Sequence, residues 1–313
     1  MEKNKLLVVG TNGFLGNSVK NIIEKENIFE LYEITGKDQL DLRNYDKVYS
    51  YFKDNNFNFV INCSAFVGGI AFGYDFPAEL LEINTTFANN LYRASMQSGV
   101  NLLVNPISNC AYPSNINYYE EEKFWDGAPH ESVFNYGLSK RHMVALGESY
   151  KNQYNFSSAN IVLSNMYGPN DHFDESRSHA LGALVKKICD AKRNNLKDVE
   201  IWGTGKPIRE WLFVEDGANA LIKALKLTED SFFFNIGVGK GISIKELAEI
   251  IAFHADWDGS FIYNTNKPDG VLEKTVNGKV GEELLDWKPS VSLDTGIKLT
   301  VEWYFNNGKK ERA

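Results

Sequence analysis

The feature that most constrains this chain is a glycine-rich turn placed directly after a short apolar run. Residues 6–9 are all apolar, and they lead into Gly10-Thr-Asn-Gly-Phe-Leu-Gly16. An apolar run that ends in such a turn and continues as a helix is typical of the first unit of a dinucleotide-binding sheet. The spacing Gly-x-x-Gly-x-x-Gly differs from the common Gly-x-Gly-x-x-Gly, so its place after a strand carries the prediction.

Each glycine of this turn has a physical purpose. Glycine is needed where the chain turns tightly, where backbone approaches a pyrophosphate and where a helix packs closely on a strand. The amides at the helix N-terminus then hold the phosphates. We therefore predict a cofactor site formed by Gly10, Thr11, Asn12, Gly13, Phe14, Leu15 and Gly16. An ordinary glycine turn is the alternative.

The first half of the chain alternates short apolar runs with longer helical patterns, which is typical of βαβ units on a parallel sheet. The strands are predicted at 6–9, 31–34, 59–62, 102–107 and 161–163, and the helices at 13–26, 77–98 and 136–154. The pattern predicts an α/β fold: a Rossmann-type doubly wound parallel sheet with a smaller mixed α/β C-terminal domain.

The pattern changes after Pro169. A polar loop is predicted over 171–178, a helix over 180–194, a turn over 202–207 and another helix over 244–253. Residues 212–225 and 232–236 again resemble the first half. We therefore predict interleaved domains: a cofactor domain of 1–165 with 211–236 returning to it, and a substrate domain of 166–210 and 237–313.

Composition excludes several classes of function. The net charge of −8 argues against a nucleic-acid-binding surface, and an anionic substrate would need local basic residues. No apolar run approaches the ~18 residues of a membrane span or the core of a signal peptide. Cys63, Cys110 and Cys189 form no Cys-x-x-Cys pair. We expect a cytoplasmic protein that has no metal and binds neither nucleic acid nor membranes.

The choice between NAD and NADP depends on the end of the second predicted strand. An acidic residue there binds ribose hydroxyls, whereas a basic residue accepts a 2′-phosphate. Glu33 lies inside the strand, and Lys37 follows its end, which favours NADP(H). Asp41 and Leu42 follow where an adenine edge would lie. The alternative for Lys37 is a solvated surface lysine.

Tyr136 and Lys140 are spaced i and i+4, so they share one face of the helix predicted over 136–154. A tyrosine with a pKa near ~10 is a poor acid at neutral pH, and we expect the adjacent ammonium of Lys140 to lower that pKa. Lys140 also suits the nicotinamide ribose. Ser108 ends the strand predicted over 102–107, where its hydroxyl can bind the same substrate oxygen. A surface pair is the alternative for Tyr136 and Lys140.

Several longer strings extend these motifs. The most specific are Ser108-Asn-Cys-Ala-Tyr-Pro113 and Trp202-Gly-Thr-Gly-Lys-Pro-Ile-Arg-Glu210; others lie at 67–70, 164–171, 178–179 and 267–270. With them the chain resembles the extended short-chain dehydrogenase/reductase family, and within it the GDP-L-fucose synthases, which are GDP-4-keto-6-deoxymannose 3,5-epimerase-4-reductases. The likeness covers most of the chain.

The resemblance implies two stages of chemistry. Cys110 and His179 match the cysteine and histidine that carry out the epimerisations, since a 4-keto group acidifies the protons at C3 and C5. NADPH then delivers hydride to C4, while Tyr136 protonates the oxygen, Lys140 tunes Tyr136 and Ser108 orients the carbonyl. Without the resemblance, Cys110 reads equally as a small buried apolar residue, and His179 as a surface histidine.

The resemblance also implies a binding site for a GDP-linked 4-keto sugar and a homodimer. It assigns the nucleotide to Lys187, Trp202, Arg209 and Asp269, and it adds Asn165 to the cofactor site. A guanidinium can bind a diphosphate in a fork, and an indole offers a flat face to a base. The alternatives are a core aromatic for Trp202 and a solvated helix face for Lys187.

Two departures from the family pattern leave alternatives open. The usual His-Arg-Gly-Met-Val-Gly turn is Thr11-Asn-Gly-Phe-Leu-Gly16 here, and the stretch between Pro113 and Tyr136 is unlike the family's. A C4-reductase without epimerase activity, acting on a GDP-4-keto-6-deoxyheptose, is therefore the second hypothesis. A non-catalytic nucleotide-binding protein on the same fold is the third.

Overall fold

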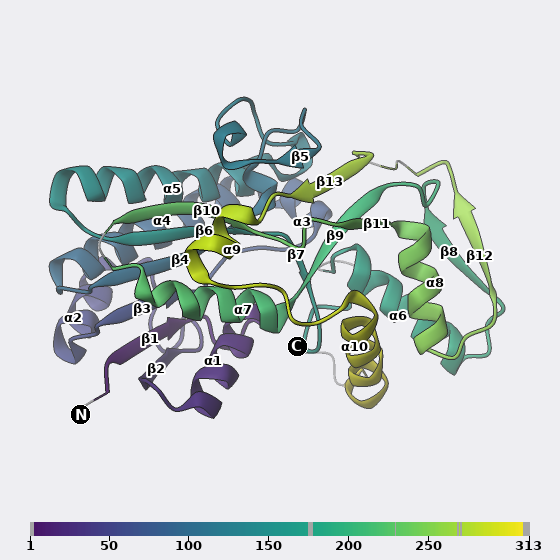
Figure 1. Cartoon of the computed structure of the whole chain (residues 1–313), viewed down its shortest axis with the longest axis horizontal. Helices are drawn as coiled ribbons and strands as arrows, with labels where there is room; N and C mark the ends of the chain where they lie inside the picture. The colour runs from purple at the N-terminus through teal and green to yellow at the C-terminus, as the bar shows by residue number, and fades with distance from the viewer. Residues whose placement is uncertain (1–2, 175–177, 229, 268, 270, 309–313) are drawn as a thin grey trace.

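The computed structural model describes residues 3–174, 178–228, 230–267, 269 and 271–308, and its centre is a six-stranded parallel sheet (Figure 1). The strand order is β10-β6-β4-β3-β1-β2, and the predicted doubly wound parallel sheet is confirmed. The strands are β1 (Lys5–Val9), β2 (Glu30–Ile34), β3 (Phe59–Asn62), β4 (Leu102–Ser108), β6 (Ser158–Leu163) and β10 (Ser231–Ile236). The order reverses between β1 and β3, and ligands of such sheets bind at this reversal.

Helices cover both faces of this sheet. One face carries α1 (Phe14–Glu26), α7 (Val214–Lys223) and α9 (Lys279–Leu285). The other face carries α2 (Tyr45–Asn55), α4 (Pro77–Gln97) and α5 (Phe134–Tyr154), and the short α3 (Ile70–Asp75) precedes α4. Burial on both faces explains why β1 is a continuous apolar run instead of an alternating one.

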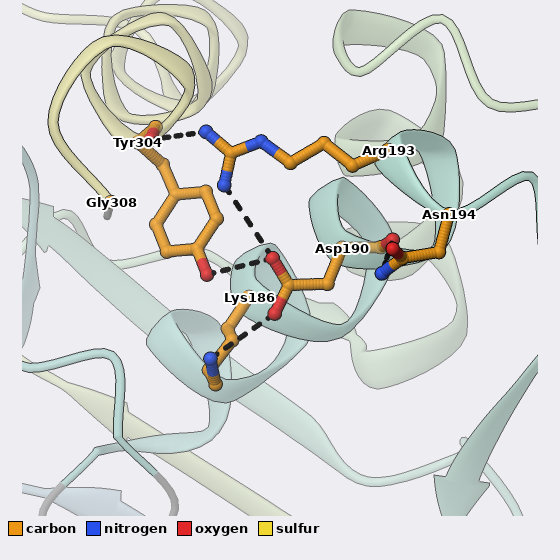
Figure 2. A pocket seen from close by; sticks show the side chains of 6 residues that line it. All are labelled: Lys186, Asp190, Arg193, Asn194, Tyr304 and Gly308. Atoms are coloured by element: carbon orange, nitrogen blue, oxygen red, sulfur yellow. Dashed lines mark hydrogen bonds and ion pairs between the residues drawn. The ribbon is translucent and has the colours of Figure 1, made fainter.

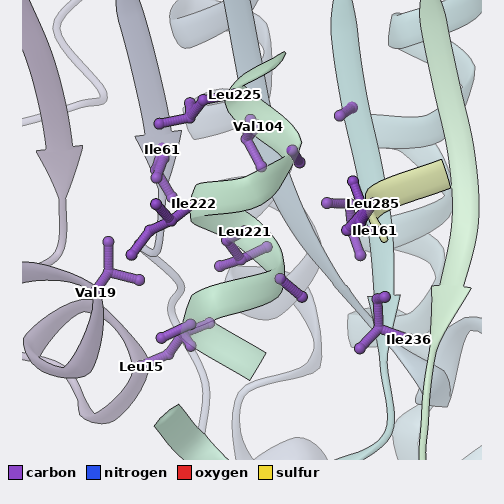
Figure 3. Packing of buried hydrophobic residues seen from close by; sticks show 14 of the residues in the cluster. Leu15, Val19, Ile61, Val104, Ile161, Leu221, Ile222, Leu225, Ile236 and Leu285 are labelled. Carbon is purple, nitrogen blue, oxygen red and sulfur yellow. The ribbon is translucent and has the colours of Figure 1, made fainter. Parts of the chain in front are cut away.

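Figure 3 shows the core on the α7 face, where aliphatic side chains of α1 and α7 meet those of the central strands. Leu221 is fully buried there, and Leu15 and Ile222 are each 9% exposed. Leu285 of α9 closes the same core beside β6 and β10. This packing fixes α1 against the end of β1, and α1 begins at the glycine-rich turn.

The second region contains a five-stranded mixed sheet and a two-stranded sheet. The five-stranded sheet comprises β5 (Tyr118–Tyr119), β7 (Asn165–Tyr167), β9 (Ile208–Phe213), β11 (Gly241–Ser243) and β13 (Glu273–Val276). Strands β8 (Asp198–Trp202) and β12 (Ser260–Asn264) pair with each other. Helices α6 (Ala180–Arg193), α8 (Ile244–His254) and α10 (Leu293–Asn307) share a core with them. Short 3-10 helices are η1 (Asn109–Ala111), η2 (Glu121–Lys123), η3 (Glu131–Val133) and η4 (Ala224–Lys226).

The chain passes between the two regions more than once, as predicted interleaving requires. Within 211–236, helix α7 and strand β10 belong to the large sheet layer, whereas residues 211–213 continue β9 of the second sheet. The exact division into domains stays a prediction. In the described ranges, no helix is both long and apolar enough to span a membrane.

The predicted strands and helices are present, with ends shifted by a few residues. Several elements were not predicted, because short strands and weakly apolar helices leave little periodic signal. They are the helices α2, α3, α9 and α10 and the strands β5, β7, β8, β9, β11, β12 and β13. Of the loop predicted over 171–178, residues 175–177 lie outside the described residues.

Candidate active site

The glycine-rich turn lies at the carboxyl end of β1, beside the end of β3. Gly10 has φ +86°, a conformation that favours glycine, and an added Cβ would lie 2.9 Å from the backbone of Cys63 and Ser64. At Gly16 an added Cβ would lie 2.2 Å from the carbonyl oxygen of Gly10. The glycines therefore allow the turn, the end of β3 and α1 to approach one another closely.

The beginning of α1 is suited to bind an anion. Its N-cap residue, Gly13, makes no side-chain capping bond, so no side chain there competes for the first amides. Thr11 Oγ1 is buried and has no hydrogen-bond partner in the part of the chain that the structure describes. Both observations fit the phosphates of a dinucleotide. The predicted residues Gly10, Thr11, Asn12, Gly13, Phe14, Leu15 and Gly16 make up this turn and the start of α1.

The first charged residue after β2 is basic, and the last acid within β2 is already paired. The Glu33 carboxylate lies 3.1 Å from Lys20 Nζ on α1, so an internal ion pair occupies it. Lys37 is exposed in the loop that follows β2. This arrangement fits a 2′-phosphate better than a free pair of ribose hydroxyls.

The predicted adenine-edge residues follow in the same loop. Asp41 accepts hydrogen bonds from Arg43 at 2.6 to 3.1 Å, and these bonds lower the pKa of Asp41 to about 2. Leu42 is buried under α4, where its carbonyl oxygen accepts a hydrogen bond from Asn90. The loop is therefore stabilised by a bond within it, between Asp41 and Arg43, and by a bond to Asn90 on α4.

Helix α5 brings Tyr136 and Lys140 to the end of β4. Lys140 is 3% exposed, and its Nζ donates to the carbonyl oxygen of Pro106 at 2.9 Å. The same nitrogen lies 5.6 Å from the centre of the Tyr136 ring. Ser108, two residues beyond Pro106, caps η1 by accepting from the amide of Cys110 at 3.2 Å. The structure thus brings together Ser108, Cys110, Tyr136 and Lys140.

A glycine makes this meeting possible. An added Cβ on Gly137 would lie 2.8 Å from the carbonyl oxygen of Cys110 and 2.9 Å from Pro129. Any larger side chain at this position would push the beginning of α5 away from η1. The Gly in Tyr136-Gly137 is therefore part of what places the phenol beside Cys110.

The acid–base properties of the cluster correct one prediction. Burial raises the pKa of Tyr136, and Cys110 raises it further, so the expected lowering by Lys140 is wrong for this structure. Burial also lowers the pKa of Lys140 to about 8, and the nearby Cys63 partly offsets this by raising that pKa. The reason is desolvation: both groups lie where water cannot stabilise their charged forms.

Two residues that the sequence analysis missed lie near Cys110. Burial raises the pKa of Tyr119, which Cys110 raises further and Arg209 lowers. Burial lowers the pKa of Lys274, while Cys110 raises that pKa and Arg209 lowers it further. Lys274 on β13 pairs in register with Arg209 on β9. A parallel pairing between strands so far apart in the chain leaves no sequence signal.

His179 lies at the N-terminus of α6, as its N-cap residue. His179 is exposed. Desolvation nevertheless lowers the pKa of its imidazole, and His172 lowers that pKa further. Among the described residues, no hydrogen bond joins His179 to Ser108, Cys110 or Tyr136. Its role in catalysis stays a prediction.

The predicted nucleotide residues come from four segments: Lys187 is on α6, Trp202 ends β8, Arg209 is on β9, and Asp269 follows β12. Trp202 is 60% exposed, which excludes the core alternative. The Nζ of Lys187 lies 5.4 Å from the centre of its ring, and that of Lys267, which was not predicted, lies 5.0 Å away. An exposed indole flanked by two ammonium groups suits an anionic ligand with an aromatic base.

Asp269 is held against the turn that follows Trp202. Its carboxylate accepts from the amide of Thr204 at 2.6 Å and from the hydroxyl of Thr204 at 2.8 Å. An added Cβ on Gly203, which has φ +76°, would lie 2.2 Å from Asp269 Oδ1. The Gly in the Trp-Gly-Thr-Gly string is therefore required for this contact.

Asn165, predicted in the cofactor site, connects three segments. Its Nδ2 donates to the carbonyl oxygen of Glu210 at 3.0 Å, and its Oδ1 accepts from Asn109 Nδ2 at 3.3 Å. Asn109 belongs to η1, between Ser108 and Cys110. Asn165 thus links the turn that carries Ser108 and Cys110 to β9.

A separate pocket lies between α6 and α10 (Figure 2). The Asp190 carboxylate accepts from the Tyr304 hydroxyl at 3.0 Å and from Lys186 Nζ at 3.1 Å. Arg193 Nη2 donates to the carbonyl oxygens of Tyr304 and Phe305. These bonds dock α10 on α6, and no predicted site residue lines the pocket. The described residues also hold no group of three His, Cys, Asp or Glu side chains placed to bind a metal.

Comparison with known proteins agrees with this geometry. A family model described as NAD dependent epimerase/dehydratase family matches residues 6–237. GDP-L-fucose synthase of Escherichia coli (strain K12) is 30% identical over 323 residues, which cover 100% of both chains.

Two solved structures resemble the whole chain. A GDP-L-fucose synthetase from Naegleria fowleri bound to NADP has a TM-score of 0.88 and 27% identity, covering 100% of this chain and 97% of that one. A GDP-mannoheptose C4 reductase from Campylobacter jejuni with NADP bound has a TM-score of 0.86 and 27% identity, covering 97% and 98%.

Proposed function

The chain belongs to the NAD dependent epimerase/dehydratase family, and on this premise we propose that it reduces C4 of a GDP-4-keto-6-deoxy sugar with NADPH. The reduction follows epimerisation at C3 and C5, as in a GDP-L-fucose synthase. The observation that carries the proposal is the meeting of Ser108, Cys110, Tyr136 and Lys140 at the end of β4. Relatives with matching full-length chains support it.

The cofactor is NADP(H), which supplies the hydride when bound. The turn Gly10-Thr-Asn-Gly-Phe-Leu-Gly16 would hold the pyrophosphate, and Lys37 would meet the 2′-phosphate. Asp41 and Leu42 would border the adenine, Asn165 would support the turn that carries Ser108, and Lys140 would bind the nicotinamide ribose. The buried Thr11 hydroxyl and the uncapped α1 N-terminus are the features that fit this group.

During reduction, Tyr136 donates its proton to the oxygen at C4, and Ser108 orients that oxygen by a hydrogen bond. Burial holds Tyr136 neutral, with its proton available, until the oxygen gains negative charge. Lys140 is a cation below pH of about 8 and stabilises the phenolate that remains.

Epimerisation uses Cys110 and His179 as the proton acceptor and donor at C3 and C5. Cys110 lies in the same turn as Ser108, so both can serve one sugar ring. The prediction for Cys110→Ser is that reduction persists while exchange of the ring protons falls by about 100-fold, because a hydroxyl is far less acidic than a thiol and stays protonated at neutral pH. Unchanged product stereochemistry with this variant would count against the role of Cys110.

The GDP part would lie along Lys187, Trp202, Arg209 and Asp269. Arg209 binds the diphosphate in a fork, Trp202 stacks on the base, and Asp269 accepts from the ribose or the guanine edge. Lys187 beside the Trp202 ring adds a positive charge that offsets the net charge of −8.

We also propose the domain division predicted above: residues 1–165 with 211–236 for the cofactor, and 166–210 with 237–313 for the sugar nucleotide. A homodimer and a cytoplasmic location belong to the same proposal. The presence of a six-stranded sheet and a separate five-stranded sheet supports the division.

A C4-reductase without epimerase activity, acting on a GDP-4-keto-6-deoxyheptose, is the second candidate. A GDP-mannoheptose C4 reductase of similar structure supports it. A non-catalytic nucleotide-binding protein is a weaker third, because Ser108, Tyr136 and Lys140 are all present and assembled.

The test is to incubate the protein with GDP-4-keto-6-deoxymannose and NADPH in deuterated water. Nicotinamide oxidation is followed by absorbance, and deuterium in the product is located by NMR. Oxidation with deuterium at C3 and C5 is expected. Oxidation without deuterium would establish the reductase alternative, and no oxidation with either the hexose or the heptose substrate would refute the proposed function.

A further inference from the structure

Glu210 is a buried carboxylate at the junction of the two sheets, and the proposed reaction gives it no task. It is 1% exposed, which is costly for a charged group unless it is hydrogen-bonded. Its Oε2 accepts from the amide of Val276 at 2.7 Å, and its Oε1 accepts from the amide of Val238. One side chain on β9 therefore holds β13 and the turn between β10 and β11.

The main chain of Glu210 takes part in the same junction. Its carbonyl oxygen accepts from Asn165, which in turn accepts from Asn109 in the Ser108–Cys110 turn. Space around the carboxylate is limited: an added Cβ on Gly237 would lie 2.5 Å from Glu210 Oε1 and 2.9 Å from Val276 Cβ. The junction is thus a close-packed contact among β7, β9, β10 and β13.

The neighbours of these anchored atoms are charged groups of the substrate side. Arg209 precedes Glu210 on β9, and Lys274 lies two residues before Val276 on β13. The two cations pair in register, and both interact electrostatically with groups around Cys110. Among the described residues, the β9–β13 register comprises two pairs, Glu273 with Ile208 and Lys274 with Arg209, and the Ile208 amide also donates to the carbonyl oxygen of Leu272. So short a pairing holds the two strands weakly by itself.

We propose that Glu210 is a positioning residue: by bonding the β13 backbone from β9, it holds Arg209 and Lys274 at a fixed spacing around the diphosphate and sugar of the substrate. Glu210 acts through these two cations and does not itself contact the substrate or the cofactor. The inference rests on the proposed function for the identity of the ligand. Small displacements of binding groups are costly, because a site must be held within about 0.5 Å of its working geometry.

Asp216 offers a matched control. It is also a buried acid, 2% exposed, that holds distant backbone: its carboxylate accepts from the amide of Ser290 at 3.0 Å, from the Ser290 hydroxyl at 2.7 Å and from the amide of Val291 at 3.0 Å. These bonds join α7 to the segment before α10, and neither carries a predicted site residue. The two acids therefore share chemistry and burial but differ in what they position.

The experiment compares the full-length protein with Glu210→Gln and Asp216→Asn. In each variant the side-chain NH2 group faces a backbone N–H group that had donated a hydrogen bond to the carboxylate. One hydrogen bond to the backbone is therefore lost, while the size of the side chain is unchanged. Dissociation constants are measured for GDP by calorimetry and for NADPH by fluorescence, beside the thermal midpoint of unfolding. KM and kcat with the sugar nucleotide follow.

For Glu210→Gln we expect GDP affinity to fall by about 10-fold and KM to rise in parallel, while the NADPH dissociation constant stays within about twofold. Asp216→Asn should lower the unfolding midpoint as much or more, with GDP affinity unchanged. Gly237→Ala, which crowds the same carboxylate without removing its charge, should reproduce the loss of GDP affinity.

Unchanged GDP affinity in Glu210→Gln, or an equal loss in Asp216→Asn, would overturn the positioning role. Failure of both Glu210→Gln and Gly237→Ala to fold, while Asp216→Asn folds, would also overturn it in favour of a purely structural one. GDP binding is measured without turnover. An inactive wild-type protein would therefore refute the proposed function, while the GDP affinities would still decide the role of Glu210.

Discussion

The cofactor side and the substrate side of this molecule are built in different ways. On the cofactor side, the residues proposed to bind the phosphates are neighbours in sequence, 10–16, at the end of one strand. On the substrate side, Cys110, Arg209 and Lys274 come from η1, β9 and β13, which are distant along the chain. A local turn needs only its own residues to be correct, whereas a site assembled from several strands also depends on contacts that hold those strands in register.

The largest effect is expected where the two sides meet. Tyr136→Phe removes the proton donor, so reduction should fall by about 1,000-fold, within the range for general acid catalysis. NADPH and GDP should still bind with near-normal affinity, since the ring and its packing remain. Stopped-flow measurement of nicotinamide oxidation, with affinities from fluorescence and calorimetry, checks this. Near-normal turnover would remove Tyr136 from the mechanism.

A pair of glycine substitutions tests whether the two sides are independent. Gly16→Ala places a Cβ 2.2 Å from the Gly10 carbonyl oxygen, and Gly203→Ala places one 2.2 Å from Asp269 Oδ1 at φ +76°. We expect Gly16→Ala to weaken NADPH binding by about 100-fold and to spare GDP, and Gly203→Ala to do the reverse, because misplacement of about 1 Å has effects of this size. Loss of both affinities in either variant would mean that the sides are coupled.

Lys37→Ala tests whether Lys37 contacts the 2′-phosphate of NADPH. The variant should bind NADPH about 10-fold more weakly and NADH equally well, since one charge-assisted contact to the 2′-phosphate is worth roughly 1.5–3 kcal/mol. Fluorescence titrations with both cofactors measure it. Equal weakening for NADPH and NADH would instead assign Lys37 to the adenosine or to the loop itself.

The last prediction concerns stability and pH. The pKa of Lys140 is lowered to about 8 in the folded protein from an ordinary value of 10.5, so the unfolded chain binds more protons between these pH values. The free energy of unfolding should therefore rise from pH 8 to pH 10.5 relative to Lys140→Met, by a few kcal/mol at most. Urea unfolding of both proteins across this range checks the sign. Parallel curves for the two proteins would contradict the lowered pKa.

Much of the first region could be predicted because its signals are local. The apolar run 6–9, the three glycines and the i, i+4 spacing of Tyr136 and Lys140 each act within a few residues, so they are visible in the sequence. The predicted strands at 6–9, 31–34, 59–62, 102–107, 161–163 and 232–236 all belong to the large parallel sheet, although their order was not predicted. Residues 10–16, Tyr136 and Lys140 lie where this reasoning placed them.

The tertiary structure decided what depends on long-range pairing and burial. Lys274 lies near Cys110 only because β13 pairs with β9. Glu210 binds distant backbone only because β13 and the turn after β10 lie beside its carboxylate. Burial likewise reverses the expected effect on the pKa of Tyr136, since desolvation outweighs a nearby cation. The sequence by itself determined the parallel sheet, the cofactor turn and the helical Tyr–Lys pair. Only the fold decided which distant charges surround the substrate, because register and desolvation are properties of the packed chain.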